Sequence, residues 1–585
     1  MQKQIVATIS KRHNTCQKMK HCLSSQLFML TAFVLLFACG KQPEPQPVVP
    51  GVPQNVVLHN AEETSLTFQW DPVEGATGYA WRLTSGGVQV KEGSASKRNV
   101  TVTGLEKATT YRFSVCALAG EKSSAYSAEI EATTAGEPYV PPGPDTGTVC
   151  VDAPVVLEFD TPPVLPAAGL IRVLDESGKE ADRIDLADMA TVAVRESDGA
   201  MVPKAQIAAD TPFNTFMDAL HCGRWRIVHY TPLRIEGNKL IITLHSEALD
   251  FGKKYKLEME GAVKEEFSTA PAPSKTEIRV AADGSGDFCT IQRALSHATD
   301  GATISVAAGT YRELLYLRDK KDITIKGDSR DGVRIVYPNN ESYEGGSGSA
   351  STSKPAIGSK VGASGGRGLF LVENCDNLRL ENLTIENSFG EQKGQAETIY
   401  FNSGNNTHRL TIENCSLISW QDTFLAKGRV WVHNSLIAGH VDYIWGYPEV
   451  CLFEECEIRS RAAGYIIQAR VPKVTDKGFV FLNCSLTAED GVSSGSVYLA
   501  RSAGQSEVFD NVVYVNCTMS PAISASGWYS SPAPNPSTPT ATGGWREFGS
   551  KDAAGKPVTG HNAYGKDLSA SEAQDYLSKE SVLGW

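Results

Sequence analysis

The sequence predicts an all-β chain in which a parallel β-helix follows two smaller β-sandwiches. Short runs rich in Val, Ile and Thr, separated by many of the 52 Gly and 29 Pro, favour short strands over long helices. Proline-rich stretches divide the first half of the 585 residues into segments. In the second half a short tag recurs with a period near 20 residues, and no helical pattern separates its copies. Such a repeat is typical of stacked rungs.

Composition and charge exclude several classes of function. Hydrophobic residues make up 41% and charged residues 21%, so a mainly disordered chain is excluded. Acidic residues outnumber basic ones by 67 to 55, and the net charge of −12 argues against a nucleic-acid partner. The sequence has no CxxC pair and no Cys/His cluster with zinc-site spacing, so we expect neither a metal nor another cofactor.

The first 38 residues resemble the signal peptide of a bacterial lipoprotein. Basic residues, among them Lys11 and Lys20, precede an apolar run over 27–38, and Cys39 follows directly. The run of 12 residues is too short to cross about 30 Å of hydrocarbon. The resemblance implies lipidation of Cys39 and a lipid anchor at the bacterial cell envelope, facing the periplasm or the outside.

Two segments between this signal and the repeat predict β-sandwiches. Residues 39–53 are proline-rich and predict an extended stalk. Residues 54–135 resemble a fibronectin type III domain, because Trp70 in SLTFQW and Tyr111 in GLEKATTYRFSV stand at that family's core positions. After a linker over 136–149, residues 150–270 alternate in runs such as NKLIITLHS and weakly resemble bacterial Ig-like domains. We expect both sandwiches to be spacers, with carbohydrate binding as the alternative for the second.

Residues 271–585 carry the repeat, whose tags include IENC (412–415), VHNS (432–435) and FEEC (453–456). Each copy predicts one rung, with the Cys or Ser in an interior column and the residue before it at a turn. Because stacked rungs lie about 4.8 Å apart and each side chain points into packed core, we expect buried free thiols rather than disulfides.

The same register brings two carboxylates together. Asp422 lies seven residues after Cys415, and Asp442 lies seven residues after Ser435, so stacked rungs place both in one column roughly 5 Å apart. Two close carboxylates resist double ionisation, so that one stays protonated while the other is an anion, as acid–base chemistry requires. Both stand in largely apolar or aromatic segments, which favours a catalytic pair over two surface acids.

These segments resemble the pectin methylesterases (pectinesterases), a family with a right-handed parallel β-helix. WQDTF (420–424) resembles the family's YQDTL, and GHVDYIWG (439–446) resembles GxVDFIFG. VAADGSGDFCTIQRAL (280–295) is similar to the family's opening strand and capping helix, and GTYRE (309–313) to its GxYxE turn. Further matches are KGQAETIY (393–400) with QAVAL, YIIQAR (465–470) with TAQGR, and YLAR (498–501) with LGRPW, whereas GTYRE alone is a weak signal.

The resemblance implies a mechanism and a partner, methyl-esterified pectin (homogalacturonan). Asp442 would be the nucleophile that attacks the C6 methyl ester of a galacturonate residue. Asp422, protonated at the start, would donate to the departing methanol and then take a proton from water. Gln421 and Gln395 would donate N–H groups to the oxyanion. Arg501 would hold Asp442 ionised. No cofactor or metal is implied, and we expect a monomer.

The sequence departs from the family in the substrate cleft. Ala503 stands where the family has the tryptophan of its RPW block, so the aromatic wall needs a replacement. Trp445, Trp420 and Tyr465 are the candidates, and Gln468 is a further substrate-binding candidate. A Gly/Ser-rich segment over 339–366 predicts a mobile loop near the cleft.

Two other functions remain open at this point. One is a catalytically silent β-helix that binds pectin or another glycan. The other is a different pectin-active β-helix enzyme, either a lyase, which would need a cluster of acids for Ca²⁺ and a basic proton acceptor, or a hydrolase with several inverting carboxylates. Neither arrangement surrounds Asp422 and Asp442 in the sequence. The leading prediction is therefore a carbohydrate esterase.

Overall fold

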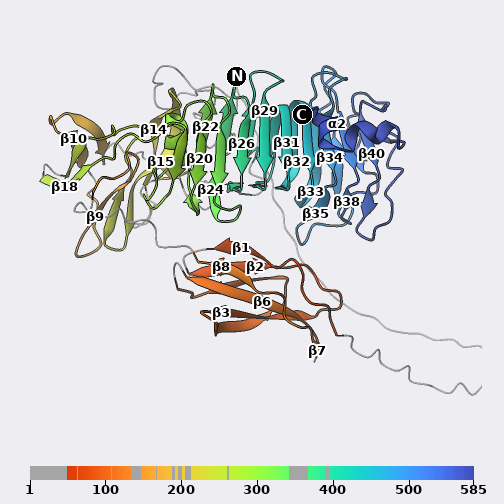
Figure 1. Ribbon diagram of the computed structural model, residues 1–585, viewed down its shortest axis with the longest axis horizontal. Coiled ribbons are helices and arrows are strands. Elements are labelled where there is room, and N and C mark those ends of the chain that lie inside the picture. Colours follow the sequence, from red (N-terminus) through yellow and green to blue (C-terminus); the bar gives the residue numbers. More distant parts are fainter. Residues whose placement is uncertain are drawn as a thin grey trace, which may run out of the picture.

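The computed structural model has a long β-helix, a β-sandwich at its N-terminal end and a second sandwich beside it (Figure 1). Cys39, the signal peptide, most of the stalk, most of the linker and most of the Gly/Ser-rich segment lie outside the described residues. No helix in the described ranges is long and apolar enough to cross a membrane. The structure describes residues 49–61, 64–106, 109–120, 122–134, 147–166, 168–186, 192–194, 201–203, 213–259, 262–341, 366–390 and 394–585.

The fibronectin-like domain has a core of its own, in two antiparallel sheets. Trp70, Tyr79, Leu105 and Tyr111 are all buried in it, which confirms the predicted core. Arg98 joins the domain to the β-helix through an ion pair of 2.7 Å with Asp490. The strands are β1 (Val57–Ala61), β2 (Ser65–Gln69), β3 (Gly78–Ser85), β4 (Val88–Ala95), β5 (Asn99–Thr103), β6 (Thr110–Ala119), β7 (Lys122–Ser123) and β8 (Ile130–Thr133).

The other sandwich consists of two four-stranded antiparallel sheets and a small hairpin. One sheet has the order β11-β10-β17-β18 and the other β14-β15-β16-β9. The alternating runs that predicted strands are strands β16 and β17. The strands are β9 (Val155–Glu158), β10 (Leu170–Asp175), β11 (Glu180–Asp185), β12 (Val192–Val194), β13 (Met201–Pro203), β14 (Phe213–His221), β15 (Arg224–Glu236), β16 (Lys239–Ile242), β17 (Lys254–Met259) and β18 (Ala262–Ser268).

This sandwich shares one continuous hydrophobic core with the β-helix, in contrast to the fibronectin-like domain. Leu240 and Leu257 of the sandwich belong to the same buried cluster as Phe288 of the β-helix. Arg293 of the β-helix pairs with Glu247 at 2.6 Å across the junction. That this sandwich is a spacer stays a prediction, but the shared core adds a second role, because the sandwich covers the apolar first rung that would otherwise face water.

The β-helix itself has three strands per turn and confirms the predicted parallel architecture. Each strand pairs in parallel with strands of the turns before and after it, so three sheets run along the molecule. We call them sheets A, B and C. Sheet A, which holds the candidate site, contains β22 (Leu315–Arg318), β25 (Phe370–Glu373), β28 (Ile399–Asn402), β36 (Val497–Arg501), β39 (Trp528–Tyr529) and parts of β31 (Phe424–His433), β32 (Leu436–Glu454) and β33 (Glu457–Ala469).

Sheets B and C complete the turns, and long strands such as β32 bend from one sheet into the next. Sheet B also contains β19 (Glu277–Val280), β20 (Thr303–Val306), β23 (Thr324–Gly327), β26 (Leu378–Glu381), β29 (Arg409–Glu413), β34 (Gly478–Leu482), β37 (Val512–Val515), β40 (Trp545–Phe548) and β42 (Gly565–Asp567). Sheet C also contains β21 (Gly309–Tyr311), β24 (Val333–Tyr337), β27 (Thr384–Asn387), β30 (Ser416–Ile418), β35 (Ser485–Ala488), β38 (Thr518–Met519) and β41 (Lys551–Asp552).

Short helices close the β-helix. Helix α1 (Ile291–His297) follows β19, as the 280–295 segment predicted, and begins at the N-cap Thr290. The 3₁₀ helix η3 (Glu572–Tyr576) and helix α2 (Lys579–Leu583) end the chain. Their apolar side chains pack in one cluster with outward-facing residues of sheet B, so that face is covered.

The recurring tags behave as predicted. Cys375, Cys415, Cys456, Cys484 and Cys517 are buried free thiols. The residue before each has a positive φ between 51° and 56°, which lies in the left-handed region that Asn tolerates better than most residues. The recurring Asn therefore turns the chain from sheet B to sheet C and lets the small Cys enter the interior.

Candidate active site

Asp422 and Asp442 occupy the same position on neighbouring turns. Phe424 pairs with Ile444 and Leu425 with Trp445, which sets an offset of 20 residues and confirms the predicted register. Both Asp residues have a left-handed backbone, with φ of 61° and 49°, at the turn from sheet C into sheet A. They are 3% and 4% exposed. The fold thus brings two buried carboxyl groups side by side, as the sequence predicted.

Asp442 is surrounded by nitrogen donors from the following turns. Arg501 donates through Nε to Oδ1 at 2.7 Å and through a second N–H to Oδ2. Gln468 donates through Nε2 to Oδ2 at 2.8 Å. The hydrogen bond to Asp442 raises the pKa of Arg501, so its charge persists. These donors orient the Asp442 carboxylate and match its negative charge.

Asp422 lies among groups of mixed charge. Burial raises its pKa well above the ordinary value, and the Glu397 carboxyl group raises it further, while Arg367 opposes the shift. A guanidinium nitrogen of Arg367 lies 3.8 Å from Oδ2 of Asp422. Asp422 therefore holds a proton under conditions in which an exposed aspartate is ionised.

The two glutamines lie beside the carboxyl groups. Gln395 and Gln421 are bridge partners on adjacent turns, and Gln421 directly precedes Asp422. Both are half-buried. The Oε1 atom of Gln395 accepts a hydrogen bond from Arg367, which leaves its Nε2 donor group for another partner.

The aromatic candidates differ in how their rings are covered. Trp445 is 4% exposed, with the guanidinium carbons of Arg367 and Arg470 at 5.1 Å and 4.9 Å from its ring centroid. Trp420 is half-buried and has Arg461 over its ring at 3.9 Å. Both rings therefore pack against cations within the protein.

Tyr465 has a different position. It is half-buried, packs against Tyr529 with ring centroids 4.9 Å apart, and has the guanidinium of Arg501 over its ring at 4.8 Å. Arg501 also pairs in register with Tyr529. An aromatic cluster thus stands next to Arg501, in the region where Ala503 replaces the tryptophan.

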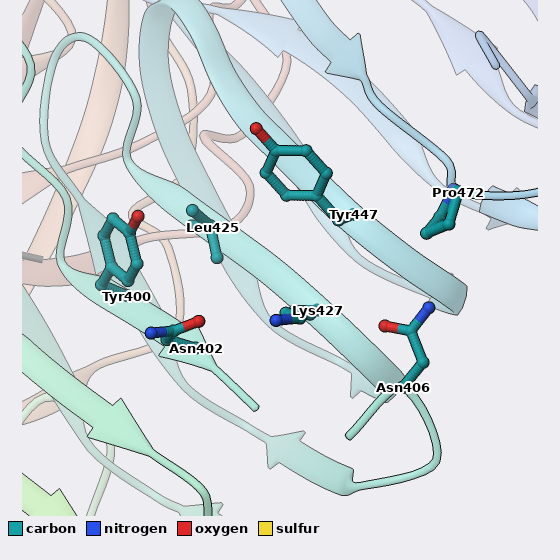
Figure 2. Close-up of a pocket in the computed structure, with 7 residues that line it drawn as sticks. All are labelled: Tyr400, Asn402, Asn406, Leu425, Lys427, Tyr447 and Pro472. Atoms are coloured by element: carbon teal, nitrogen blue, oxygen red, sulfur yellow. The ribbon is translucent and has the colours of Figure 1, made fainter. Parts of the chain in front are cut away.

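A pocket of about 390 Å³ extends the site along sheet A (Figure 2). Figure 2 shows Tyr400, Leu425 and Tyr447 on consecutive strands, with the amide of Asn406 at the far end. Tyr447 belongs to β32, the strand that holds Asp442, and Leu425 is the register partner of Trp445, so the pocket lies directly beside the candidate site. Its lining consists of Tyr400, Asn402, Asn406, Leu425, Lys427, Tyr447 and Pro472.

Sequence reasoning missed four residues around the carboxyl pair: Arg367, Glu397, Arg470 and Tyr400. Glu397 carried a signal, since it is the one acid in the strand-like run QAETIYF. Arg367 carried none, because it follows the Gly/Ser-rich segment and reaches the site only through the fold. Gln468, predicted to bind substrate, is 7% exposed and contacts Asp442 and Arg470.

The site thus combines a parallel β-helix with two buried carboxyl groups on adjacent turns, one bound by an arginine and one with a raised pKa, beside two amide side chains, an arrangement typical of hydrolytic enzymes. Comparison with known proteins identifies the family. The pectinesterase family model matches residues 277–580, and the fibronectin type III model matches residues 51–133. The chain therefore belongs to the pectinesterase family.

The chain is also similar to individual proteins. The chain is 33% identical to Pectinesterase 31 of Arabidopsis thaliana over 261 residues, which cover 43% of this chain and 76% of the relative. It is 31% identical to Probable pectinesterase A of Aspergillus niger over 272 residues, which cover 46% and 76% of the two chains. The crystal structure of the pectin methylesterase from Aspergillus niger matches with 28% identity and a TM-score of 0.42, over 54% of this chain and 95% of that one.

Proposed function

We propose that Asp442 and Asp422 carry out the pectinesterase reaction of this chain, which hydrolyses C6 methyl esters of galacturonate residues in pectin and releases methanol and pectate. One observation carries the assignment. Two buried carboxyl groups stand on adjacent rungs, one bound by Arg501 and the other kept protonated by burial. The first suits a nucleophile and the second suits an acid.

In the first step an oxygen of Asp442 attacks the ester carbonyl and forms a tetrahedral oxyanion. Gln421 and Gln395 donate N–H groups to that oxyanion, a contribution worth roughly 10²–10³ in turnover in other enzymes. The intermediate collapses to an acyl-enzyme anhydride as Asp422 transfers its proton to the departing methoxide oxygen. Methanol leaves, and Asp422 is now a carboxylate.

In the second step a water molecule replaces methanol. Asp422 accepts a proton from the water, and the oxygen attacks the galacturonoyl carbonyl of the anhydride. The acyl–oxygen bond breaks, which frees the galacturonic acid and restores Asp442 as a carboxylate and Asp422 as an acid. Arg501 holds the leaving Asp442 oxygen in place throughout.

The pocket of Figure 2 would hold a sugar next to the reacting one. Tyr400 and Tyr447 offer aromatic surface, and Lys427 offers a positive charge in the same pocket. A demethylated galacturonate carries a carboxylate that an ammonium group attracts, whereas a methyl ester does not. The lining therefore supports binding of partly demethylated chains.

Incubation of the purified protein with highly methylated pectin tests this function. Methanol release with equal formation of carboxylate is expected. Absorbance of unsaturated uronate would instead identify a lyase, and retention on immobilised pectin without product would identify a binding protein. Asp442→Asn in parallel must remove methanol release, which excludes a contaminating esterase.

We further propose that the chain is exported and anchored through a lipid on Cys39, and that it acts as a monomer at the cell envelope. The basic segment, the apolar run and the position of Cys39 support the anchor. Incorporation of labelled fatty acid into the wild-type protein, and its loss in Cys39→Ala, is the expected result. Sedimentation of a protein that starts after Cys39 should give one chain.

A further inference from the structure

A buried ion pair lies directly beside the carboxyl pair. Glu397 is fully buried, and its Oε1 lies 2.8 Å from Nε of Arg367. Burying two charges costs more free energy than apolar side chains of the same size would, so stability alone does not account for the pair. The QAVAL block that this segment resembles has valine at the position of Glu397.

Arg367 connects three groups of the site. It pairs with Glu397, donates a hydrogen bond to Oε1 of Gln395 and comes within 3.8 Å of Asp422. A carboxamide has its oxygen and its NH₂ group on opposite sides. A donor that holds the Gln395 oxygen therefore turns the NH₂ group away from itself and fixes the direction in which that group can donate.

Glu397 balances the charge that Arg367 brings. An unpaired guanidinium at 3.8 Å from Asp422 would favour the ionised carboxylate and remove the proton that the first step uses. The charged and titratable groups that interact with Asp422 are Asp442, Glu397, Arg367, Arg470 and Arg501. Burial raises the pKa of Glu397 itself to about 7, so its charge is lost in acid and present above neutral pH.

We propose that Arg367 and Glu397 act as a positioning pair, in which Arg367 orients the amide of Gln395 and Glu397 offsets the arginine charge so that Asp422 remains an acid. This proposal rests on the proposed function of Asp422. In this proposal neither residue contacts the substrate. Arg367 acts through Gln395, and Glu397 acts through the protonation of Asp422.

The test compares the pH profile of kcat for methanol release in the wild type, Glu397→Gln, Glu397→Val and the double variant Arg367→Met/Glu397→Val. Asp422 works as an acid, so activity is present below its pKa and is lost as pH rises through it. Without Glu397 this pKa falls. The alkaline limb of both single variants should therefore move down by about one pH unit or more, with KM changed less than about threefold.

The double variant separates the two roles. With both charges gone, the alkaline limb should return toward its wild-type position, while kcat stays about tenfold or more below wild type because Gln395 is no longer oriented. If the alkaline limb of the kcat profile in Glu397→Gln and Glu397→Val lay at the same pH as in the wild type, the proposal would be overturned. Thermal melting shows which variants fold, and Glu397→Gln keeps the shape of the side chain. Absence of methanol release by the wild type would instead refute the proposed function.

A second, independent observation concerns Cys150 and Cys289. Both are buried, and one ligand atom of each, with one of Asp152, lies within 4.8 Å of the others. Cys150 is at the start of the sandwich, before strand β9, and Cys289 precedes helix α1. Asp152 accepts N–H groups of Cys289 and Thr290 at 3.0 Å and 2.8 Å, so its oxygens already serve the start of that helix.

We infer that Cys150 and Cys289 form a disulfide after export, which joins the sandwich to the first rung of the β-helix. The two thiols lose two protons and two electrons to the disulfide of a thiol–disulfide oxidoreductase, which is reduced to its dithiol. The tag cysteines differ because they point into the main core of the β-helix, whereas Cys150 and Cys289 form a small separate cluster where the sandwich meets the first rung. Asp152, engaged with the helix, is a poor third ligand for a metal.

Peptide mapping tests the link on protein that was exported into an oxidising compartment and purified without reductant. We expect a non-reduced peptide pair that contains Cys150 and Cys289, and eight titratable thiols in the denatured protein out of the ten described cysteines. Ten thiols without a linked pair would overturn the inference. One zinc ion per chain held in the wild type but absent from Cys289→Ser would overturn it in favour of a metal site.

Discussion

Asp442 and Asp422 stand at the same place on consecutive turns of the β-helix, with the same left-handed backbone, yet their surroundings differ. Asp442 accepts hydrogen bonds from Arg501 and Gln468, which belong to the next strands of sheet A. Asp422 instead faces Glu397, whose charge Arg367 partly offsets. The stacked repeat supplies two equivalent positions, and neighbouring side chains surround one with nitrogen donors and raise the pKa of the other.

Removal of the anionic member should have the largest effect. Asp442→Asn keeps the shape of the side chain but loses the nucleophile, so methanol release should fall on the order of 10⁴-fold or more. Asp322→Asn is the matched control, since Asp322 is exposed and has a φ of 56°. Methanol assays and melting curves of both variants decide the matter. Turnover near the wild-type value in Asp442→Asn would mean that another residue attacks the ester.

Removal of the acidic member should cost less. Asp422→Asn eliminates the proton donor, which is typically worth about 10²–10⁴ in turnover. Because burial raises the pKa of Asp422, wild-type activity should extend to higher pH than an ordinary aspartic acid would allow, and it should fall as pH rises through that pKa. In Asp422→Asn the residual activity should no longer show this fall at high pH. A variant that keeps the wild-type limb would show that another group supplies the proton.

Weakening the donors of Asp442 should have an intermediate effect. Arg501→Lys keeps a positive charge but cannot form the two-point contact with both carboxylate oxygens. We expect kcat to fall by roughly 10- to 100-fold with a smaller change in KM, since orientation of the nucleophile is lost. Arg461→Lys, which alters an arginine stacked on Trp420 instead, is the control. Equal losses in both variants would contradict a specific role for Arg501.

The tryptophans should affect stability more than catalysis. Trp445 is almost fully buried between two guanidinium groups, so Trp445→Ala should cost about 3–5 kcal/mol of unfolding free energy. Trp420→Ala should cost less, because Trp420 is half-buried. Melting temperature and KM for each variant are the measurements. A raised KM with an unchanged melting temperature in either variant would instead indicate that this tryptophan binds the sugar in place of the family's cleft tryptophan.

The smallest effect on turnover should come from removal of the fibronectin-like domain. A protein that begins at Gly147 loses a domain with a core of its own, and its kcat on soluble pectin should stay within about twofold of the full chain. A protein that begins at Pro273 also loses the shared core around Phe288 and should be insoluble or poorly folded. A stable, active protein from Pro273 would contradict the shared-core interpretation.

The sequence by itself determined the features that recur with the repeat. The period of the tags predicted the rungs, the buried thiols and the turn residues, and the seven-residue offset predicted that Asp422 and Asp442 share a column. The reason is that in a β-helix neighbours in space are separated by a nearly constant number of residues, so spacing along the chain reports contact. Gln395, Gln421 and Arg501 came from resemblance to the family motifs, not from spacing.

Only the tertiary structure decided which residues outside the repeat contact the site and which surfaces pack together. Arg367 follows the long Gly/Ser-rich segment, so no fixed spacing links it to Glu397 or Asp422. The covering of Trp445 by guanidinium groups and the core shared by the sandwich and the first rung depend on packing between distant segments. These contacts depend on the path of irregular segments and on burial, which a local pattern of residues does not encode.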